Sequence, residues 1–278
     1  MRPKVVIFVA PKTEAIQAAK DIENRLRDRG WRVLQVVSLG SRADVEALKQ
    51  CDLVLTLGGD GPILYASRLM ERIGKPILGI NFGKIGLLTE VGLDEFYESL
   101  ERIESGNYRV ERYRRLVAKN LSSNKTYPSA LNEYAVMTRS PGKILGLDIF
   151  LDGEHIACVL CDGLVISTPI GSTSYSLSSG GPVVVDWMEA MIIVPIAPLF
   201  RSMYPIVAPC ETKLRVKIRE EWIDAILIGD GIILDGLRRG DELEISYGDL
   251  TTSFIRLGGK YSRLRKISGT MLIKVRLR

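Results

Sequence analysis

Apolar positions in the first hundred residues follow two alternating patterns. Short continuous apolar runs, of the kind found in buried strands, occur at 4–9, 31–37, 53–57 and 76–80. Amphipathic stretches predict helices at 13–29, 44–50, 62–72 and 93–106. Strands that alternate with helices are typical of a parallel sheet with right-handed crossovers. Residues 1–109 are therefore predicted to form a Rossmann-like, parallel-sheet α/β domain.

After residue 108 the pattern changes to many short strand-like runs with few helices between them. The runs lie at 109–119, 129–139, 146–151, 156–161, 163–167, 214–218, 225–228, 242–246 and 252–257. Many short strands separated by turn signals such as Asp-Gly are typical of an antiparallel sandwich. We therefore predict a β-rich sandwich domain at 110–257. The basic tail at 258–278 is a candidate to pack back on the first domain.

A glycine-rich turn, Gly58-Gly59-Asp60-Gly61, joins the third predicted strand to a helix that starts at Pro62. Such a junction lies at the carboxyl end of a parallel strand, where ligands bind in α/β proteins. Glycines let the backbone approach a phosphate closely, and the helix start offers free N–H groups. A carboxylate in a phosphate site suggests that Asp60 holds Mg²⁺ or takes a proton from an attacking hydroxyl. The plain alternative is a tight turn in which Asp60 caps the helix.

A second glycine-rich turn follows the fourth predicted strand, at residues 81–89. It carries Gly83, Lys84 and Gly86 and is predicted to form a second wall of the same crevice. The alternative is an ordinary surface loop.

The run from Asp162 to Pro182 is the richest motif of the second half. A strand leads into a loop crowded with serine and threonine, then into a short helix and a Gly-Gly-Pro stop. Hydroxyls and backbone N–H groups at a helix start suit phosphate, ribose and base edges, and Tyr175 could stack on a base. The alternative is a Ser/Thr-rich capping loop. Upstream, Asn132-Glu133 pairs an amide with a carboxylate that could read an adenine edge and a ribose hydroxyl, although a dipeptide alone is not diagnostic.

Composition narrows the class of partner. Apolar residues make up 46%, enough for a full core, and 38 basic against 33 acidic residues give a net charge of +5. The excess of basic residues suits an anionic ligand. These residues are spread along the chain, whereas nucleic-acid-binding proteins usually carry a clustered basic stripe. No membrane segment is expected, because the apolar stretch 188–200 contains two prolines and is shorter than the roughly 20 residues of a span.

Cysteine and histidine usage argues against a protein-built metal site. The four cysteines show no disulfide framework, which indicates reduced thiols in a cytoplasmic protein. Cys158 and Cys161 have CxxC spacing but fall in a predicted strand, where positions i and i+3 point to opposite faces. His155 is the only histidine. No metal-ligating residue is therefore assigned.

Taken together, the motifs resemble those of the archaeal and bacterial NAD kinase family. The resemblance rests on Gly58–Gly61, then Asn132-Glu133, then the run Asp162–Pro182 with its Gly180-Gly181-Pro182 end, in that order and spacing. It implies the two-domain fold predicted above. It also implies transfer of a phosphoryl group from ATP or polyphosphate to the 2′-hydroxyl of the adenosine ribose of NAD, giving NADP. Mg²⁺ is expected to accompany the donor, and the resemblance implies a homodimer or homotetramer.

The resemblance also implies roles for individual residues. Asp60 would be the catalytic carboxylate, with Gly58, Gly59, Gly83, Lys84 and Gly86 in the phosphate loops. Asp162 would lie near the nicotinamide half, at a subunit contact. Residues implied to bind the dinucleotide, chiefly through its adenosine half, are Gly61, Asn132, Glu133, Thr173, Ser174, Tyr175 and Ser178.

Three features depart from the family pattern. Leu87 stands where a phenylalanine is usual, Tyr204-Pro205 stands where Arg-Pro is usual, and the tail 261–278 matches the family's last helix poorly. Two other functions stay open from sequence. One is a lipid or sugar kinase that shares the GGDG turn, and the other is a non-catalytic NAD-binding module in which Asp60 only binds ribose.

Overall fold

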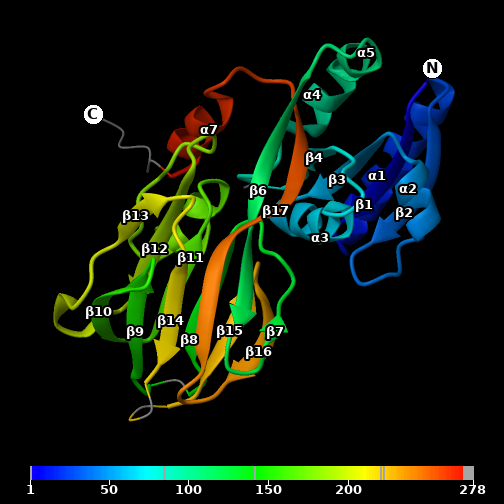
Figure 1. The fold of residues 1–278 in the computed structure, drawn as a ribbon. Coiled ribbons are helices and arrows are strands. Elements are labelled where there is room, and N and C mark those ends of the chain that lie inside the picture. The colour runs from blue at the N-terminus through cyan, green and yellow to red at the C-terminus, as the bar shows by residue number, and fades with distance from the viewer. Residues whose placement is uncertain (1, 84–85, 141, 220, 222, 272–278) are drawn as a thin grey trace, which may run out of the picture. The chain divides into compact units, whose positions relative to one another are not determined.

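The computed structural model describes residues 2–83, 86–140, 142–219, 221 and 223–271. The chain forms two compact units (Figure 1): unit 1 comprises Met1–Arg112 and Thr251–Arg278, and unit 2 comprises Tyr113–Leu250. Unit 2 is thus one continuous insertion in the sequence of unit 1. Residues 251–257, grouped above with the second domain, belong to unit 1 because strand β17 (Glu242–Arg256) continues out of unit 2.

Unit 1 is a parallel sheet covered by helices. Its strands lie in the order β17-β4-β3-β1-β2, and β1 pairs in parallel with both β2 and β3. The elements in chain order are β1 (Lys4–Val9), α1 (Thr13–Asp28), β2 (Arg32–Ser38), α2 (Val45–Gln50), β3 (Leu53–Gly58), α3 (Asp60–Met70), β4 (Ile77–Asn81), β5 (Val91–Gly92), α4 (Leu93–Glu98), α5 (Leu100–Glu104) and, after unit 2, α7 (Ser262–Met271).

The core of unit 1 follows from the apolar pattern of its sequence. Every residue of β3 is buried, as expected for a strand covered on both faces. Helix α1 buries Ala15, Ala19, Ile22 and Leu26, which share one face at helical spacing. Ile255 and Leu257, which follow unit 2 in the sequence, complete this core.

Unit 2 is an antiparallel sandwich. One layer has the order β13-β12-β11-β8-β15-β16, and the other contains β10-β9-β14-β17 with β6 paired to β17. The elements are β6 (Arg109–Asn120), β7 (Lys125–Thr126), β8 (Glu133–Thr138), β9 (Leu145–Leu151), β10 (Glu154–Cys161), β11 (Gly163–Ser167), η1 (Ile170–Thr173), α6 (Tyr175–Ser178), β12 (Ala190–Ile196), η2 (Leu199–Arg201), β13 (Ile206–Pro209), β14 (Leu214–Ile218), β15 (Ala225–Gly229) and β16 (Ile232–Leu237).

Side chains from both layers of unit 2 meet in one apolar core. Val136 and Leu164 come from the first layer, and Leu147 and Val216 come from the second. The architecture confirms the predicted fold class, a Rossmann-like parallel-sheet domain followed by a β-rich sandwich.

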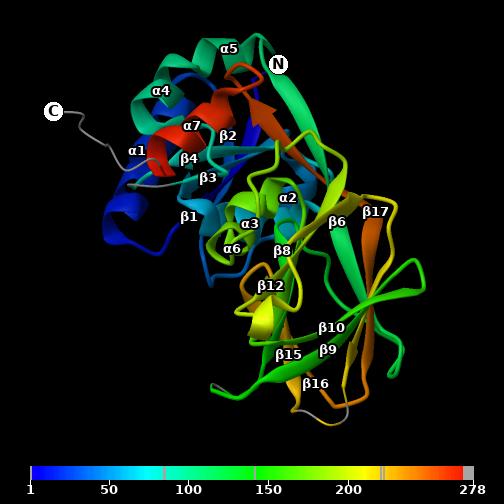
Figure 2. The same cartoon turned by 90° about the vertical axis from the view of Figure 1, so that its left-hand side faces the viewer.

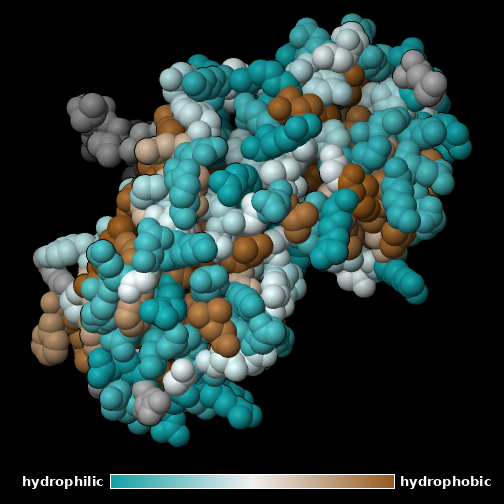
Figure 3. All heavy atoms as spheres, in the orientation of Figure 1, coloured by the Kyte–Doolittle hydropathy of each residue, from teal (hydrophilic) through white to brown (hydrophobic). Residues whose placement is uncertain are grey.

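The face drawn in Figure 3 is mostly hydrophilic, with apolar positions scattered over it in small groups. The apolar stretch at 188–200 supplies strand β12, which is buried along most of its length. Among the described residues, no helix combines the length and apolar character needed to cross a membrane.

Candidate functional site

Asp60 opens helix α3 in unit 1, directly after the buried strand β3. Gly58 has a φ of +145°, and a Cβ there would lie 2.9 Å from Pro62 Cγ and 3.0 Å from Ala10 Cβ, so the turn requires glycine. A Cβ added to Gly61, by contrast, would meet nothing within 4 Å. The backbone next to Asp60 is therefore open on this side.

Both oxygens of Asp60 are used by the second glycine-rich turn. The backbone N–H of Leu88 donates to Oδ1 at 2.9 Å, and that of Leu87 donates to Oδ2 at 3.3 Å. The N-cap residue of α3 is Gly59, and no side-chain cap is present. Asp60 thus serves as an anchored carboxylate rather than as the cap of its own helix, and the two glycine-rich turns lie together in unit 1.

The second turn is itself tightly built. A Cβ on Gly86 would lie 2.6 Å from Thr89 Oγ1 and 2.9 Å from Asn81 Oδ1, so this position also requires glycine. Gly83 precedes it in open space. Lys84 lies outside the described residues.

In unit 2 the Asn132-Glu133 pair sits at the start of β8, held by a carboxylate that the motifs did not single out. Asp230 Oδ1 accepts the backbone N–H groups of Asn132 at 2.8 Å and Glu133 at 3.2 Å, and Oδ2 accepts that of Leu131 at 2.8 Å. The buried guanidinium of Arg115 lies 3.8 Å from Asp230 Oδ2. The only sequence signal was the Asp230-Gly231 turn pair, because burial of a charged side chain leaves no local pattern.

The side chains of this pair are buried and incompletely hydrogen-bonded. Asn132 Oδ1 and Glu133 Oε2 have no hydrogen-bond partner among the residues that the structure describes, and the same is true of Ser176 Oγ and Ser179 Oγ. Buried polar atoms in native proteins are normally paired, so this group of atoms is suited to a polar ligand.

Burial also changes the charge of Glu133. Burial first, and the nearby negative charge of Asp230 second, raise the pKa of Glu133 to about 8. At neutral pH its carboxyl group is therefore largely protonated, so the pair can offer a donor as well as acceptors to a ligand.

The raised pKa makes the stability of the protein depend on pH. Between the ordinary pKa of 4.5 and the folded value of about 8, folded Glu133 keeps a proton that the unfolded chain loses. Its contribution to the free energy of unfolding should therefore fall as pH rises, by up to about 1.4 kcal/mol per pH unit. We expect urea denaturation from pH 5 to pH 8 to show this loss in the wild type relative to Glu133→Gln. Parallel curves for the two proteins would contradict it.

The hydroxyl-rich loop packs directly on the Asn132-Glu133 backbone. Thr168 Oγ1 donates to Leu131 O at 2.7 Å, and Ser174 Oγ donates to Glu133 Oε1 at 3.3 Å. A Cβ on Gly171 would lie 2.2 Å from Asn132 O, so only glycine allows this approach. Of the predicted adenosine-binding residues, Asn132, Glu133 and Ser174 are therefore brought together in unit 2.

Four further predicted residues have different surroundings. Thr173 is buried in η1, whereas Ser178 is exposed at the end of α6. Tyr175 is partly buried, packs beside Val165 and Val194, and donates to Met137 Sδ at 3.6 Å. Asp162 is exposed just before β11, at the opposite end of that strand from Ser167. Burial and then the charges of Asp162 and Glu133 raise the pKa of the Tyr175 hydroxyl.

Two family models match the chain over most of its length. The ATP-NAD kinase N-terminal domain covers residues 5–108, and the ATP-NAD kinase C-terminal domain covers residues 131–257. The chain belongs to the NAD kinase family. Both glycine-rich turns lie in the first matched segment. The Asn132-Glu133 pair and the hydroxyl-rich loop lie in the second.

Curated relatives and solved structures agree with this family assignment. The NAD kinase of Methanothermobacter thermautotrophicus is 36% identical over 259 residues, which are 90% of this chain and 90% of that protein. The bifunctional NADP phosphatase/NAD kinase of Methanocaldococcus jannaschii is 34% identical over 271 residues, and the chain spans only 46% of its length.

The structure of an NAD kinase from Archaeoglobus fulgidus in complex with ATP superposes with a TM-score of 0.78 at 29% identity, over 96% of this chain and 98% of that one. Yeast NADH kinase complexed with NADH shares the fold, with a TM-score of 0.84 at 23% identity, over 100% of this chain and 90% of that one.

Proposed function

We propose that the protein phosphorylates NAD, transferring the γ-phosphoryl group of ATP to the 2′-hydroxyl of the adenosine ribose and releasing NADP and ADP. The observation that carries the proposal is the buried Asn132-Glu133 pair, whose Oδ1 and Oε2 atoms have no partner among the described residues. An amide beside a protonated carboxyl can recognise a base edge and ribose hydroxyls. A lipid or sugar kinase that shares the GGDG turn would not need this pair.

The proposed reaction needs a proton acceptor. The ribose oxygen attacks the γ-phosphorus, the bond to the β-phosphate oxygen breaks, and ADP leaves with that electron pair. The hydroxyl proton passes to Asp60, because a hydroxyl is a poor nucleophile at neutral pH unless its proton is accepted. The N–H groups of Leu87 and Leu88 fix the carboxylate, and each of its oxygens accepts one hydrogen bond from the described residues, which leaves a second lone pair for the proton.

Unit 2 would hold the adenosine half of NAD. Asn132 and Glu133 would bind through their unpaired atoms, and the Ser176 and Ser179 hydroxyls of the loop are further partners without a bond among the described residues. Asp162 would lie toward the nicotinamide half. We infer a homodimer or homotetramer from the same family resemblance, and light scattering of the purified protein tests it. The free thiols of all four cysteines suit the proposed cytoplasmic location.

Mg²⁺ is proposed to enter with the phosphate donor. Asp60 is the carboxylate of the glycine-rich turn, and Mg²⁺ in kinases is commonly held by one or two carboxylates together with substrate phosphates. The ion would neutralise the donor's phosphate charge. The one cluster of three potential metal ligands among the described residues, Glu189, Cys210 and Glu211, includes a thiol and is poorly suited to Mg²⁺.

We therefore expect NADP formation to stop in excess EDTA and to return when Mg²⁺ is restored. The physical reason is repulsion between Asp60 and a polyanionic donor that no cation screens. Activity measured by an NADP-specific coupled assay decides this. Full turnover in EDTA would remove the ion from the proposal.

The direct test of the function is incubation of the protein with NAD, ATP and Mg²⁺, followed by detection of NADP and ADP in equal amounts. NAD binding without NADP would favour the non-catalytic binding module. ADP formed only with a lipid or a sugar would favour the other kinases. Polyphosphate in place of ATP tests the donor in the same assay.

Replacement of Tyr175 by alanine should raise the KM for NAD about tenfold. Stacking of a base on an aromatic ring contributes roughly 1–3 kcal/mol, and Tyr175 is only partly buried. Steady-state kinetics at saturating ATP measure the change. If KM is unchanged and only the melting temperature falls, the ring serves the packing against Val165 and Val194 alone.

A further inference from the structure

Helix α7 lies beyond the segment that the family models match, which ends at residue 257. Figure 2 shows α7 within unit 1. Its side chains are hydrogen-bonded to the turn that holds Asp60. Arg263 Nε donates to Leu87 O at 3.2 Å, and Lys266 Nζ donates to Thr89 O at 3.0 Å and to Thr89 Oγ1 at 2.8 Å. The helix therefore contacts residues that no family motif connects with it.

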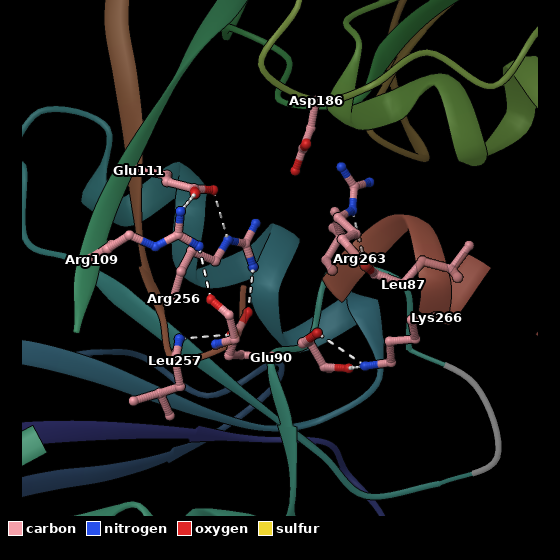
Figure 4. A network of polar contacts seen from close by, with 12 residues as sticks. Leu87, Glu90, Arg109, Glu111, Asp186, Arg256, Leu257, Arg263 and Lys266 are labelled. Carbon is pink, nitrogen blue, oxygen red and sulfur yellow. Dashed lines mark hydrogen bonds and ion pairs between the residues drawn. The ribbon is translucent and has the colours of Figure 1, made fainter. Parts of the chain in front are cut away.

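The same short turn bonds to Asp60 and to Lys266. Figure 4 shows Arg263 and Lys266 of α7, with Arg263 reaching Leu87 of the turn. Thr89 Oγ1, which accepts from Lys266, donates to Gly86 O at 2.8 Å. The next two backbone N–H groups, of Leu87 and Leu88, donate to the Asp60 carboxylate. Hydrogen bonds thus link the Lys266 ammonium to Thr89 and Thr89 to the Gly86 carbonyl, and the Gly86–Leu87 peptide group connects this carbonyl to an N–H that bonds to Asp60.

The start of α7 is fixed to the same region by Glu90, the residue after Thr89. Glu90 Oε1 accepts the backbone N–H groups of Leu257 at 2.7 Å and Gly258 at 2.8 Å, and Arg256 Nη1 lies 3.1 Å from Glu90 Oε2. Side chains of the Arg256–Glu90 pair are only 6% and 7% exposed. The segment that leads into α7 is therefore fixed in unit 1, and Lys266 is held beside Thr89.

The partly buried position of Lys266 is unfavourable for a charged ammonium group unless that charge has a role. Burial lowers its pKa, while the negative charges of Asp60, Glu90 and Glu95 oppose that effect. Thr89 is only 4% exposed. A lysine that only anchored a helix could donate to exposed carbonyls at less cost in desolvation.

We propose that Lys266 is a positioning residue for Asp60, holding the Gly86–Thr89 turn so that the Leu87 and Leu88 N–H groups keep the carboxylate in its reactive orientation. The proposal rests on the phosphoryl transfer proposed above. Displacement of a catalytic group by about 1 Å can cost up to a hundredfold in rate, so a residue that fixes the turn affects turnover without touching substrate.

The test compares three variants of the full chain in the NADP assay. Lys266→Met removes the ammonium but keeps the length of the side chain, Lys266→Arg keeps a donor, and Arg265→Met removes an exposed charge from the same helix. For Lys266→Met we expect kcat to fall about tenfold or more with the KM for NAD within twofold of wild type. Lys266→Arg should recover most of the loss, and Arg265→Met should match the wild type.

A second readout does not depend on activity. Hydrogen exchange at the Leu87 and Leu88 amides should be faster in Lys266→Met than in Arg265→Met, because those amides bond to Asp60 only while the turn is held. If Lys266→Met does not fold, Thr89→Val replaces it, since valine removes the Oγ1 bonds to Lys266 and Gly86.

An unchanged kcat, a loss confined to KM, or unaltered exchange at the two amides would overturn the positioning role. If the wild type forms no NADP, the proposed function fails, and amide exchange alone then decides whether Lys266 holds the turn.

Discussion

Asp60→Asn is expected to lower the kcat for NADP formation by about 10²–10⁴ while leaving the affinity for NAD nearly unchanged. Asparagine matches aspartate in shape, and its Oδ1 can still accept the Leu88 N–H bond now made at 2.9 Å. It cannot accept a proton from the ribose hydroxyl. The loss should therefore appear in the chemical step rather than in binding.

Two measurements on the same protein decide this result: kcat from NADP formation and the Kd for NAD from calorimetry. Asp94→Asn is a suitable control, because Asp94 is an exposed carboxylate in the first turn of α4 in the same unit. A near wild-type kcat with a weakened Kd would make Asp60 a ribose ligand and restore the binding-module alternative.

The second large effect is expected on stability. Asp230→Asn should lower the free energy of unfolding by about 3–5 kcal/mol, the usual cost of breaking a buried charge pair by removing one partner. Arg115 would keep its charge while fully buried, 3.8 Å from a neutral amide. Three backbone N–H groups now donate hydrogen bonds to Asp230. In the variant, the amide nitrogen would face at least one of these groups, so that two hydrogen-bond donors would point at each other.

Urea denaturation measures this change, with Asp235→Asn as the matched control. Asp235 lies within β16 of the β15–β16 hairpin, but its pair with Lys125 is partly exposed, so loss of this pair should cost no more than about 1 kcal/mol. Equal effects of the two substitutions would mean that the buried pair contributes no more than a surface pair. Because Asp230 holds the Asn132-Glu133 backbone, the variant that remains folded should also bind NAD more weakly.

The elements of unit 1 follow from sequence because β1, β3 and β4 are buried along most of their length and read as nearly unbroken apolar runs. The strand at the end of unit 2 was harder to predict. The runs at 242–246 and 252–257, with Gly248 between them, were predicted as two strands, whereas the structure has one strand, Glu242–Arg256. A Cβ on Gly248 would lie 2.7 Å from Val117 Cγ1, so glycine is needed there for close strand packing and not for a turn.

The residues of the candidate site likewise include some that local sequence patterns reveal and others that only the structure reveals. Glycine-rich turns and a hydroxyl-rich loop are local patterns, so Asp60, Asn132, Glu133 and the loop could be picked from sequence. Asp230 lies 97–99 residues from the three backbone groups that it holds. Lys266 lies 177 residues from Thr89. Contacts this distant in sequence leave no spacing signal, so neither residue could be assigned a role before the structure.

The insertion of unit 2 within unit 1 has a consequence for synthesis on the ribosome. The first 112 residues emerge first, yet unit 1 lacks its β17 segment and the core residues Ile255 and Leu257 until the end of the chain is made. Unit 2 is complete as soon as residue 250 has emerged. The part of the protein translated second should therefore mature first, and the nascent Rossmann-like unit should leave Ile77 at the start of β4 without its β17 partner, Phe254, until the last strand arrives.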